Sequence, residues 1–416
     1  MNYPVFTEEM KKDYTILVPT MLPVHFTLII NVLKNYGYNA ELLENKGKEL
    51  IDNGLKYVHN DTCYPALVVI GQLITAIQSG KYNKHKIALL ITQTGGGCRA
   101  SNYIHLLRKA LIKADLDYIP VISLNFSGLE SEHTGFKMTF PLFMRMFYSI
   151  QIGDLLMTLK NQCMPVEINK GQSAVLEKKW IEKASILLRR KKVKQKDIKQ
   201  IYSEIIKDFF LIPRKENKNI VKVGIVGEIF VKFSPLGNNE LEEFLNSEGA
   251  EVSMSGLLDF CLYCIYNNVA DYKLYGISRH KAIVFSLVYK YLLKLQKQHI
   301  NLIKKLSDFS SPTPFSEVVK ITKGYVSIGA KMGEGWLLTA EMLELLQKGV
   351  NNIICVQPFG CLPNHIVGKG MIKLIKQRNN KANIVAIDYD ASATKVNQEN
   401  RIKLMLATAK EAMNSR

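Results

Sequence analysis

The sequence reads Lys86-Ile87-Ala88-Leu89-Leu90-Ile91-Thr92-Gln93-Thr94-Gly95-Gly96-Gly97-Cys98, an apolar run followed by a glycine-rich turn. Residues 86–92 predict a buried strand, and residues 99–114 predict the helix that follows the turn. Strand, turn and helix in this order are typical of a βα unit in a parallel sheet. Three glycines in a row lose much conformational entropy on folding, so we expect a tight turn or a close backbone approach there.

The same alternation continues on both sides of this stretch. Further strands are predicted at residues 16–18, 40–43, 118–124, 222–227, 251–254, 325–329, 352–357 and 383–388. Helical patterns lie between most of them, and residues 257–305 form one long lysine-rich helical stretch. Repeated strand–helix alternation predicts the α/β class, with mostly parallel sheets that are covered by helices on both faces.

Proline, charge and asparagine mark the best domain boundary, residues 212–219, directly before a new apolar strand. We expect a first α/β lobe at residues 1–165, which carries Cys63 and Cys98. A helical connector is expected at residues 166–220, and a second α/β lobe with Cys361 at residues 221–416. A chain of 416 residues is long enough for two or three such lobes.

The composition, 47% hydrophobic and 22% charged, is that of a globular protein and not of a disordered or membrane chain. The longest apolar stretch near the start, residues 15–33, is interrupted by Pro19, Pro23 and His25, too often for a bilayer span. It also lacks the basic start and the cleavage site of a signal peptide. We therefore expect a cytoplasmic protein whose seven cysteines are reduced thiols.

The formal net charge of +18 comes mostly from lysines spread over predicted helix faces. A lysine-rich proteome is the first explanation of this excess. Binding of an anion, such as a cofactor phosphate or an acidic partner surface, is the second. Nucleic acid ranks third, because no aromatic-interleaved basic strand or recognition-helix pattern accompanies the charge. We expect neither a nucleic-acid nor a membrane partner.

Three cysteines occupy turns that are marked by glycine or proline. These turns read His59-Asn60-Asp61-Thr62-Cys63-Tyr64-Pro65, Gly95-Gly96-Gly97-Cys98-Arg99-Ala100-Ser101 and Gln357-Pro358-Phe359-Gly360-Cys361-Leu362-Pro363-Asn364-His365. Each lies where a strand-like run gives way to a helical pattern, the usual place for ligands in an open α/β sheet. Three thiolates from separate loops suit an iron–sulfur cluster better than a lone zinc ion, whose structural sites usually pair ligands at short spacing.

The remaining cysteines have a simpler interpretation. Cys261 and Cys264 form a C-x-x-C inside an apolar helical pattern, without a flanking turn or a second pair. Core packing is the better interpretation for this pair, and Cys163 and Cys355 are likewise interpreted as core or linker residues.

Three cysteines leave one iron of a cubane open, and we expect a substrate pocket beside it. Glycines let a ligand approach the backbone closely. The predicted substrate-binding residues are Gly95, Gly96, Gly97, Arg99, Asn102, Gly333 and Gly335. Glu334 and His365 are the predicted catalytic groups, which would handle protons. In the alternative interpretation Glu334 stabilises the N-terminus of the helix that starts there, and His365 is an ordinary helix residue.

No phosphate loop for ATP is found in the sequence. Residues 387–395 superficially resemble the phosphate loop of actin-like ATPases but lack the glycine that such loops need. The turn at Cys98 has neither the spaced glycines nor the Gly-Lys-Ser/Thr ending. We expect no ATPase activity from this chain alone.

Taken together, the cysteine turns, Gly333-Glu334-Gly335-Trp336 and the strand end Gly224-Ile225-Val226-Gly227-Glu228 resemble the 2-hydroxyacyl-CoA dehydratase and ATP-dependent reductase superfamily. The resemblance is nearest to the C-terminal, non-ATPase module of the CoA-substrate-specific enzyme activase proteins. It runs over nearly the whole chain, including residues 400–409, and the cysteine turns are its specific part.

The resemblance implies two or more flavodoxin-like (Rossmann-like) lobes with a [4Fe-4S] cluster between them, held by Cys63, Cys98 and Cys361. It implies a separate ATP-dependent activator of the actin-like ATPase class, because this chain lacks the ATPase lobes. In the dehydratases, one electron reduces a CoA-thioester to a ketyl radical, which expels the hydroxyl before the electron is recycled. The implied enzyme is a dehydratase-like lyase or the component of a low-potential reductase.

Three alternatives stay open at this stage. The first is a double-cubane-cluster reductase of small molecules, for which Cys264 and Cys355 are the only further thiols we can name. The second is an electron-transfer or scaffold subunit whose cluster meets no substrate. The third is a zinc-stabilised binding protein. Whether the chain forms a homo- or heterodimer is also open.

Overall fold

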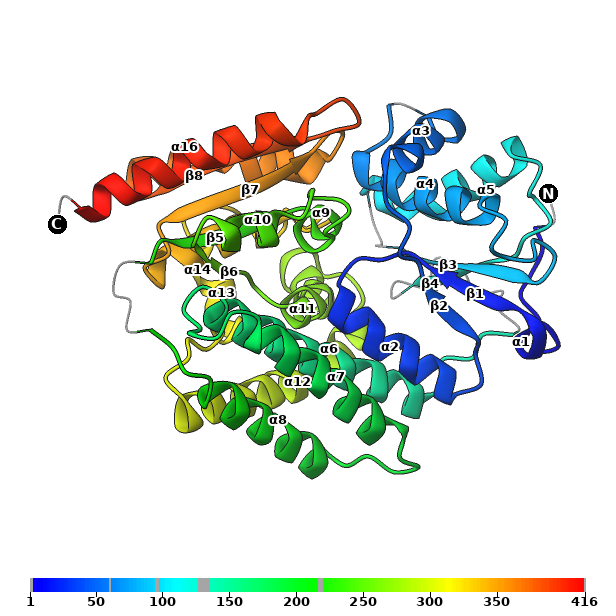
Figure 1. Cartoon of the computed structure of the whole chain (residues 1–416), viewed down its shortest axis with the longest axis horizontal. Helices are drawn as coiled ribbons and strands as arrows, with labels where there is room; N and C mark the ends of the chain where they lie inside the picture. The colour runs from blue at the N-terminus through cyan, green and yellow to red at the C-terminus, as the bar shows by residue number, and fades with distance from the viewer. Residues whose placement is uncertain (1–2, 60, 94–96, 126–134, 216–219, 415–416) are drawn as a thin grey trace.

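Two four-stranded parallel sheets organise the protein. The computed structural model describes residues 3–59, 61–93, 97–125, 135–215 and 220–414 (Figure 1). The strand order is β2-β1-β3-β4 in the first sheet and β6-β5-β7-β8 in the second. The strands are β1 Thr15–Val18, β2 Ala40–Leu42, β3 Ile87–Gln93, β4 Val121–Asn125, β5 Lys222–Gly227, β6 Glu251–Ser253, β7 Asn352–Pro358 and β8 Asn383–Tyr389. The expected α/β class with two flavodoxin-like lobes is confirmed.

Helices cover both faces of the first sheet, because alternate residues of its strands are apolar on opposite sides. The helix α2 Pro23–Asn35 packs on Ile16, Ala88 and Ile122. The other face, with Leu17 and Leu89, packs on three helices. These are α3 Lys48–Tyr57, α4 Tyr64–Gln78 and α5 Tyr103–Lys113. The short helices α1 Met10–Asp13 and η1 Arg99–Asn102 complete this lobe.

The second sheet is covered in the same way. One face packs against α14 Trp336–Gln347 and α15 Ile372–Arg378. The opposite face packs against α10 Leu241–Ser247 and α16 Lys395–Asn414. Its remaining helices are α9 Ile229–Phe233, α13 Phe315–Ile321, η2 Asn364–Gly368 and η3 Lys369–Met371.

Long helices from different parts of the chain form a separate layer below the two sheets in the view of Figure 1. They are α6 Phe140–Cys163, α7 Gln172–Arg189, α8 Gln195–Phe210, α11 Leu257–Tyr275 and α12 Arg279–Leu306. The predicted connector, residues 166–220, contains α7 and α8, which pack against α6, α2 and α12. Within the described residues, no helix is both long and apolar enough to cross a bilayer.

The strand predicted at residues 325–329 is wrong. This segment continues from α13 as a series of turns, in which the N–H groups of Tyr325 and Val326 donate to the Thr322 carbonyl at 2.9 and 3.1 Å. Its alternating apolar residues imitate a strand, but a strand also needs a neighbour to pair with. The predicted helix at 362–377 is divided into η2, η3 and α15, and the long helical stretch breaks at Gly276, which has φ 69°.

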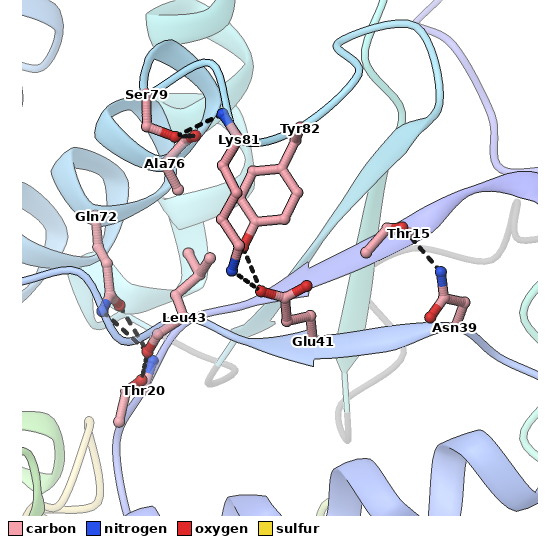
Figure 2. A network of polar contacts seen from close by, with 10 residues as sticks. All are labelled: Thr15, Thr20, Asn39, Glu41, Leu43, Gln72, Ala76, Ser79, Lys81 and Tyr82. Atoms are coloured by element: carbon pink, nitrogen blue, oxygen red, sulfur yellow. Dashed lines mark hydrogen bonds and ion pairs between the residues drawn. The ribbon is translucent and has the colours of Figure 1, made fainter.

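Hydrogen bonds fix α4 against the carboxyl ends of the first two strands (Figure 2). The buried Gln72 amide accepts from the Thr20 N–H at 3.1 Å and donates to the Leu43 carbonyl at 3.5 Å. At the sheet edge, the Lys81 ammonium and the Tyr82 hydroxyl both bond to the Glu41 carboxylate. Because α4 begins directly after Cys63, these bonds also position that cysteine.

The crossing of α3 and α4 has no room for a side chain at Gly71. A Cβ atom there would lie 2.1 Å from the Leu50 carbonyl oxygen, so the backbones would have to separate. We expect Gly71→Ala to lower the free energy of unfolding by about 2–3 kcal/mol, as overpacked cores do. Urea unfolding measures this, and Asp52→Ala on the exposed side of α3 is the control, expected to change it by less than about 0.5 kcal/mol. An unchanged Gly71→Ala protein would contradict the close crossing.

Candidate metal centre

Each of the three predicted ligand cysteines stands at the start of a helix. Cys63 is the N-cap residue of α4, Cys98 is the N-cap residue of η1, and Cys361 lies between β7 and η2. The backbone N–H groups of Ala66, Ala100 and Asn364 act to lower the pKa values of the Cys63, Cys98 and Cys361 thiols, respectively. They favour the thiolate form, because free N–H groups at a helix start favour negative charge.

The three sulfurs open into one cavity of about 290 Å³ between the two lobes. The cavity is lined by Cys63, Pro65, Gly97, Cys98, Arg99, Ala100, Tyr103, Glu228, Ile229, Gly333, Glu334, Gly360, Cys361, Leu362, Pro363 and His365. These residues come from the carboxyl ends of β3, β5 and β7 and from the starts of α4 and α14. Ligands of parallel α/β sheets bind at this edge.

Backbone contacts hold the cysteine loops together. The Tyr64 N–H donates to the Phe359 carbonyl at 3.0 Å, which joins the loop of Cys63 to that of Cys361. The Arg99 guanidinium donates to the Asp61 carbonyl, which joins the loop of Cys98 to that of Cys63. The Gly97 N–H lies 3.0 Å from the Met332 sulfur, so the segment before α14 is attached as well.

Two glycines allow this close approach. At Gly333, with φ 57°, a Cβ atom would lie 3.4 Å from the Cys98 sulfur and 3.1 Å from Pro363 Cγ. At Gly360, with φ 73°, it would lie 3.0 Å from the Cys63 Cα. Both backbone conformations strain any residue with a side chain, so both positions need glycine.

Burial keeps the thiols protonated while no metal is bound. It raises the pKa of Cys98 to about 11, and it raises the pKa values of Cys63 and Cys361 as well. The carboxylates of Glu228 and Glu334 add to the upward shift of the Cys361 pKa. The Tyr103 hydroxyl, 3.0 Å from the Cys63 sulfur, partly offsets the effect of burial on the Cys63 pKa. Metal binding would release these protons.

Glu228 is a cavity residue that the sequence analysis missed. It follows Gly227 at the carboxyl end of β5. This position at a strand end was the feature of the sequence that could have marked it as a site residue. Burial, together with the charge of Glu334, raises the Glu228 pKa to about 8. Burial also raises the Glu334 pKa. At least one of the two carboxyl groups therefore carries a proton at neutral pH.

Glu334 does not stabilise the helix that begins beside it. Its Oε1 accepts from the Ile229 N–H at 3.0 Å, at the start of α9 in another part of the lobe. Its Oε2 is buried without a hydrogen-bond partner. An unpaired buried carboxyl oxygen is costly, so this atom is available to a ligand or a water molecule.

Only some of the other predicted site residues line the cavity. Gly97, Arg99, Gly333 and His365 line the cavity, and the His365 side chain is exposed at its rim. Gly95 and Gly96 lie outside the described residues. Asn102 is exposed on η1 and does not line the cavity. Gly335 does not line the cavity either. A Cβ atom at this position would lie 2.2 Å from the Ala330 carbonyl oxygen, so Gly335 packs against the backbone of its own segment.

None of the remaining four cysteines lines the cavity. Cys163 and Cys355 are fully buried in apolar cores, which confirms their predicted place. Cys261 and Cys264 are half-buried on α11. Among the described residues, no group of three or more His, Cys, Asp or Glu side chains could hold a metal ion.

A second cavity, of about 100 Å³, lies between α6, α12 and the second sheet. Its lining includes Asp154, Asp259, His299 and Glu341 but none of the predicted site residues. Most of its carboxylates already have partners, such as the Glu341–Lys232 ion pair at 2.9 Å. The candidate site is therefore the cysteine-lined cavity. No known family model and no curated protein matches the chain.

The raised Glu228 pKa predicts a pH dependence of stability for the metal-free protein. Between about pH 4.5 and pH 8, the folded state keeps a proton that the unfolded state has lost, so stability falls as the pH rises. Glu228→Gln should remove this loss, which is on the order of 1 kcal/mol per pH unit. Urea unfolding across this range measures it, with Glu243→Gln on the surface as the control. If the free energy of unfolding falls with pH equally in wild type and Glu228→Gln, the raised pKa of Glu228 is contradicted.

Proposed function

We propose that Cys63, Cys98 and Cys361 hold one [4Fe-4S] cluster at the junction of the lobes. The observation that carries the proposal is the convergence of three thiols, from three separate loops, on one cavity. Each thiol has a backbone N–H donor, and hydrogen bonds to the sulfurs are among the factors that tune such clusters. The site would work where thiols stay reduced, as in the cytoplasm.

The surroundings of the thiols fit such a group. Protonated carboxyls of Glu228 and Glu334 would avoid repulsion with the thiolates, and the glycines leave the sulfurs uncovered. Three cysteines would satisfy three of the four irons, so one iron would be left without a cysteine ligand. Glu334 lines the cavity and has an unpartnered carboxyl oxygen, Oε2, which could serve as a further ligand or hold a proton.

The proposed activity is that of a 2-hydroxyacyl-CoA dehydratase-like lyase or a low-potential reductase component. The cluster, when bound, would supply single electrons received from a separate ATP-dependent activator of the actin-like class. Glu334 and His365 would hold or move protons, and Arg99 at the rim would orient a carbonyl or an anion. A CoA-thioester is the first substrate class, and a small molecule the second.

Two alternatives differ in what the cluster does. A double-cubane reductase would need about three further thiolates. Neither Cys264 nor Cys355 lines the cavity, and the Cys355 thiol donates to the Asn364 side chain at 3.4 Å inside the core. The single cubane is therefore favoured. A non-catalytic electron-transfer subunit would need no open side, and the cavity beside Glu334 counts against it.

Cysteine replacement tests the ligand set. After anaerobic purification, wild type should contain about four irons and four sulfides per chain. Each of Cys63→Ala, Cys98→Ala and Cys361→Ala should lose most of this iron and the paramagnetic-resonance signal of the reduced cluster. Cys261→Ala and Cys264→Ala are the matched controls and should keep both, because their thiols lie outside the cavity.

Each of the other outcomes has a definite meaning. Equal iron in all five variants would show that the ligand assignment is wrong. About eight irons per chain would favour the double cubane. A cluster that is reduced by the activator but gives no turnover with any CoA-thioester or small-molecule acceptor would favour the electron-transfer subunit.

A further inference from the structure

A broad apolar surface lies on the helical hairpin that α11 and α12 form. Its nine members are large apolar side chains that are each 39–64% exposed. They are Tyr272, Leu274, Tyr275, Ile277, Ile283, Val284, Leu287, Val288 and Tyr291, and we call them the hairpin face. Large apolar side chains that gather on an exposed surface often mark a place that a partner covers.

The helical spacing explains how this face arises. The C-terminal half of α12 is an ordinary amphipathic helix, with Leu295, His299 and Ile303 buried in the helical layer. Apolar residues continue into the N-terminal half, at positions 283, 284, 287, 288 and 291. These positions share one side of a helix, and that side is exposed among the described residues.

The charged residues of the hairpin from Tyr272 to Ser307 have one sign. No Asp or Glu occurs from Tyr272 to Ser307, a span that carries eight lysines and arginines. These are Lys273, Arg279, Lys281, Lys290, Lys294, Lys297, Lys304 and Lys305, and all are exposed. None has an ion pair among the described residues. Pairing of two copies through this face would bring like charges together, so an acidic partner is complementary to it.

The hairpin also holds the segment that forms one wall of the cysteine-lined cavity. The Tyr263 hydroxyl on α11 lies 2.8 Å from the Lys331 carbonyl and 2.9 Å from the Gly333 carbonyl. Lys331 forms an ion pair with Asp271, also on α11. Gly333 in turn lies against Cys98. A protein bound to the hairpin face would therefore sit on the helices that position this wall.

We propose that the hairpin face is the docking surface for the electron-donating activator, and that this partner presents an apolar patch bordered by Asp and Glu. The inference rests on the proposed function, because it names the place where that activator binds. The face offers what a docking site needs, namely an apolar centre with aromatic side chains and a charged rim. The rim would also speed association at low salt.

Binding of the purified actin-like activator from the same organism, reduced and with ATP, tests the docking surface. We expect Leu287→Ser/Tyr291→Ser to weaken the Kd by at least about 10-fold, because the pair removes the apolar centre. The control is Val175→Ser/Ile186→Ser on α7, where equally exposed apolar residues are changed, with an expected effect of less than about 2-fold. Iron content and the unfolding midpoint, measured for every variant, show that both pairs leave the fold and the cluster intact.

Charge reversal provides the second arm. Wild-type binding should weaken between about 50 and 300 mM salt, because exposed charges are screened. Lys281→Glu/Lys290→Glu/Lys294→Glu should weaken binding at low salt and lose most of this salt dependence.

The outcomes separate the docking surface from the proposed function. If wild type holds its cluster and binds the activator, but the hairpin variants bind it equally well, the docking proposal fails and the proposed function stands. If wild type holds its cluster but does not bind the activator, both the docking proposal and the activator as electron donor are overturned. Wild-type protein without iron would overturn the proposed function, whatever the binding result.

A wild-type dimer that Leu287→Ser/Tyr291→Ser dissociates would assign the face to self-association. Variant-sensitive binding to vesicles of equal parts phosphatidylglycerol and phosphatidylcholine would assign it to a membrane. Either result would overturn the docking proposal.

Discussion

The hydrogen bond from the Tyr64 N–H to the Phe359 carbonyl, 3.0 Å long, joins the two lobes where their cysteine loops meet. It lies one residue after Cys63 and two residues before Cys361. The apolar residues around it belong to a core that extends from the first sheet into the second. The position of the candidate site therefore depends on how the carboxyl ends of two separate sheets are held together. The loops need glycine at two positions, because a Cβ atom would crowd the Cys98 sulfur at Gly333 and the Cys63 Cα at Gly360.

The joining of the two lobes also sets the electrostatics of the cavity. Three thiols and two carboxyl groups would place five negative charges in one buried space if all were ionised, and each buried ion costs several kcal/mol. Burial therefore raises the pKa values of the thiols and of both carboxyl groups, which favours their protonated forms. The nearest buried lysine, Lys232, already forms an ion pair with Glu341 at 2.9 Å, so its charge is largely matched. A metal cluster could displace the thiol protons and leave those of the carboxyls in place.

Much of the fold could be predicted from sequence because burial on both faces makes parallel strands continuous apolar runs. Residues 222–227 form a strand with the predicted bounds, and the pattern also located β7 and β8 to within a residue or two. Residues 325–329 were mispredicted because a pattern of side chains does not show whether a neighbouring strand exists. The cysteines of the candidate site were visible as turn residues, but Glu228 was not. A glutamate after a strand is ordinary in sequence, and its burial beside Glu334 appears only in the folded structure.

The seven cysteines differ in the role that they can take, and this difference follows from where each one lies in the fold. Cys163 and Cys355 lie on elements packed on all sides, where a small apolar side chain is sufficient. Cys261 and Cys264 are three residues apart on α11, and a helix presents such a pair on neighbouring faces without a turn to bring ligands to it. Cys63, Cys98 and Cys361 each stand between a strand or loop and a helix start, where backbone N–H groups have no carbonyl partner in the helix. A thiolate at such a place has donors ready for its charge, and no cysteine inside a helix or strand has them. Cys98 and Cys361 follow the ends of β3 and β7, whereas Cys63 lies in the loop between α3 and α4. The chemistry of this chain therefore depends on the contacts that bring these three loops together.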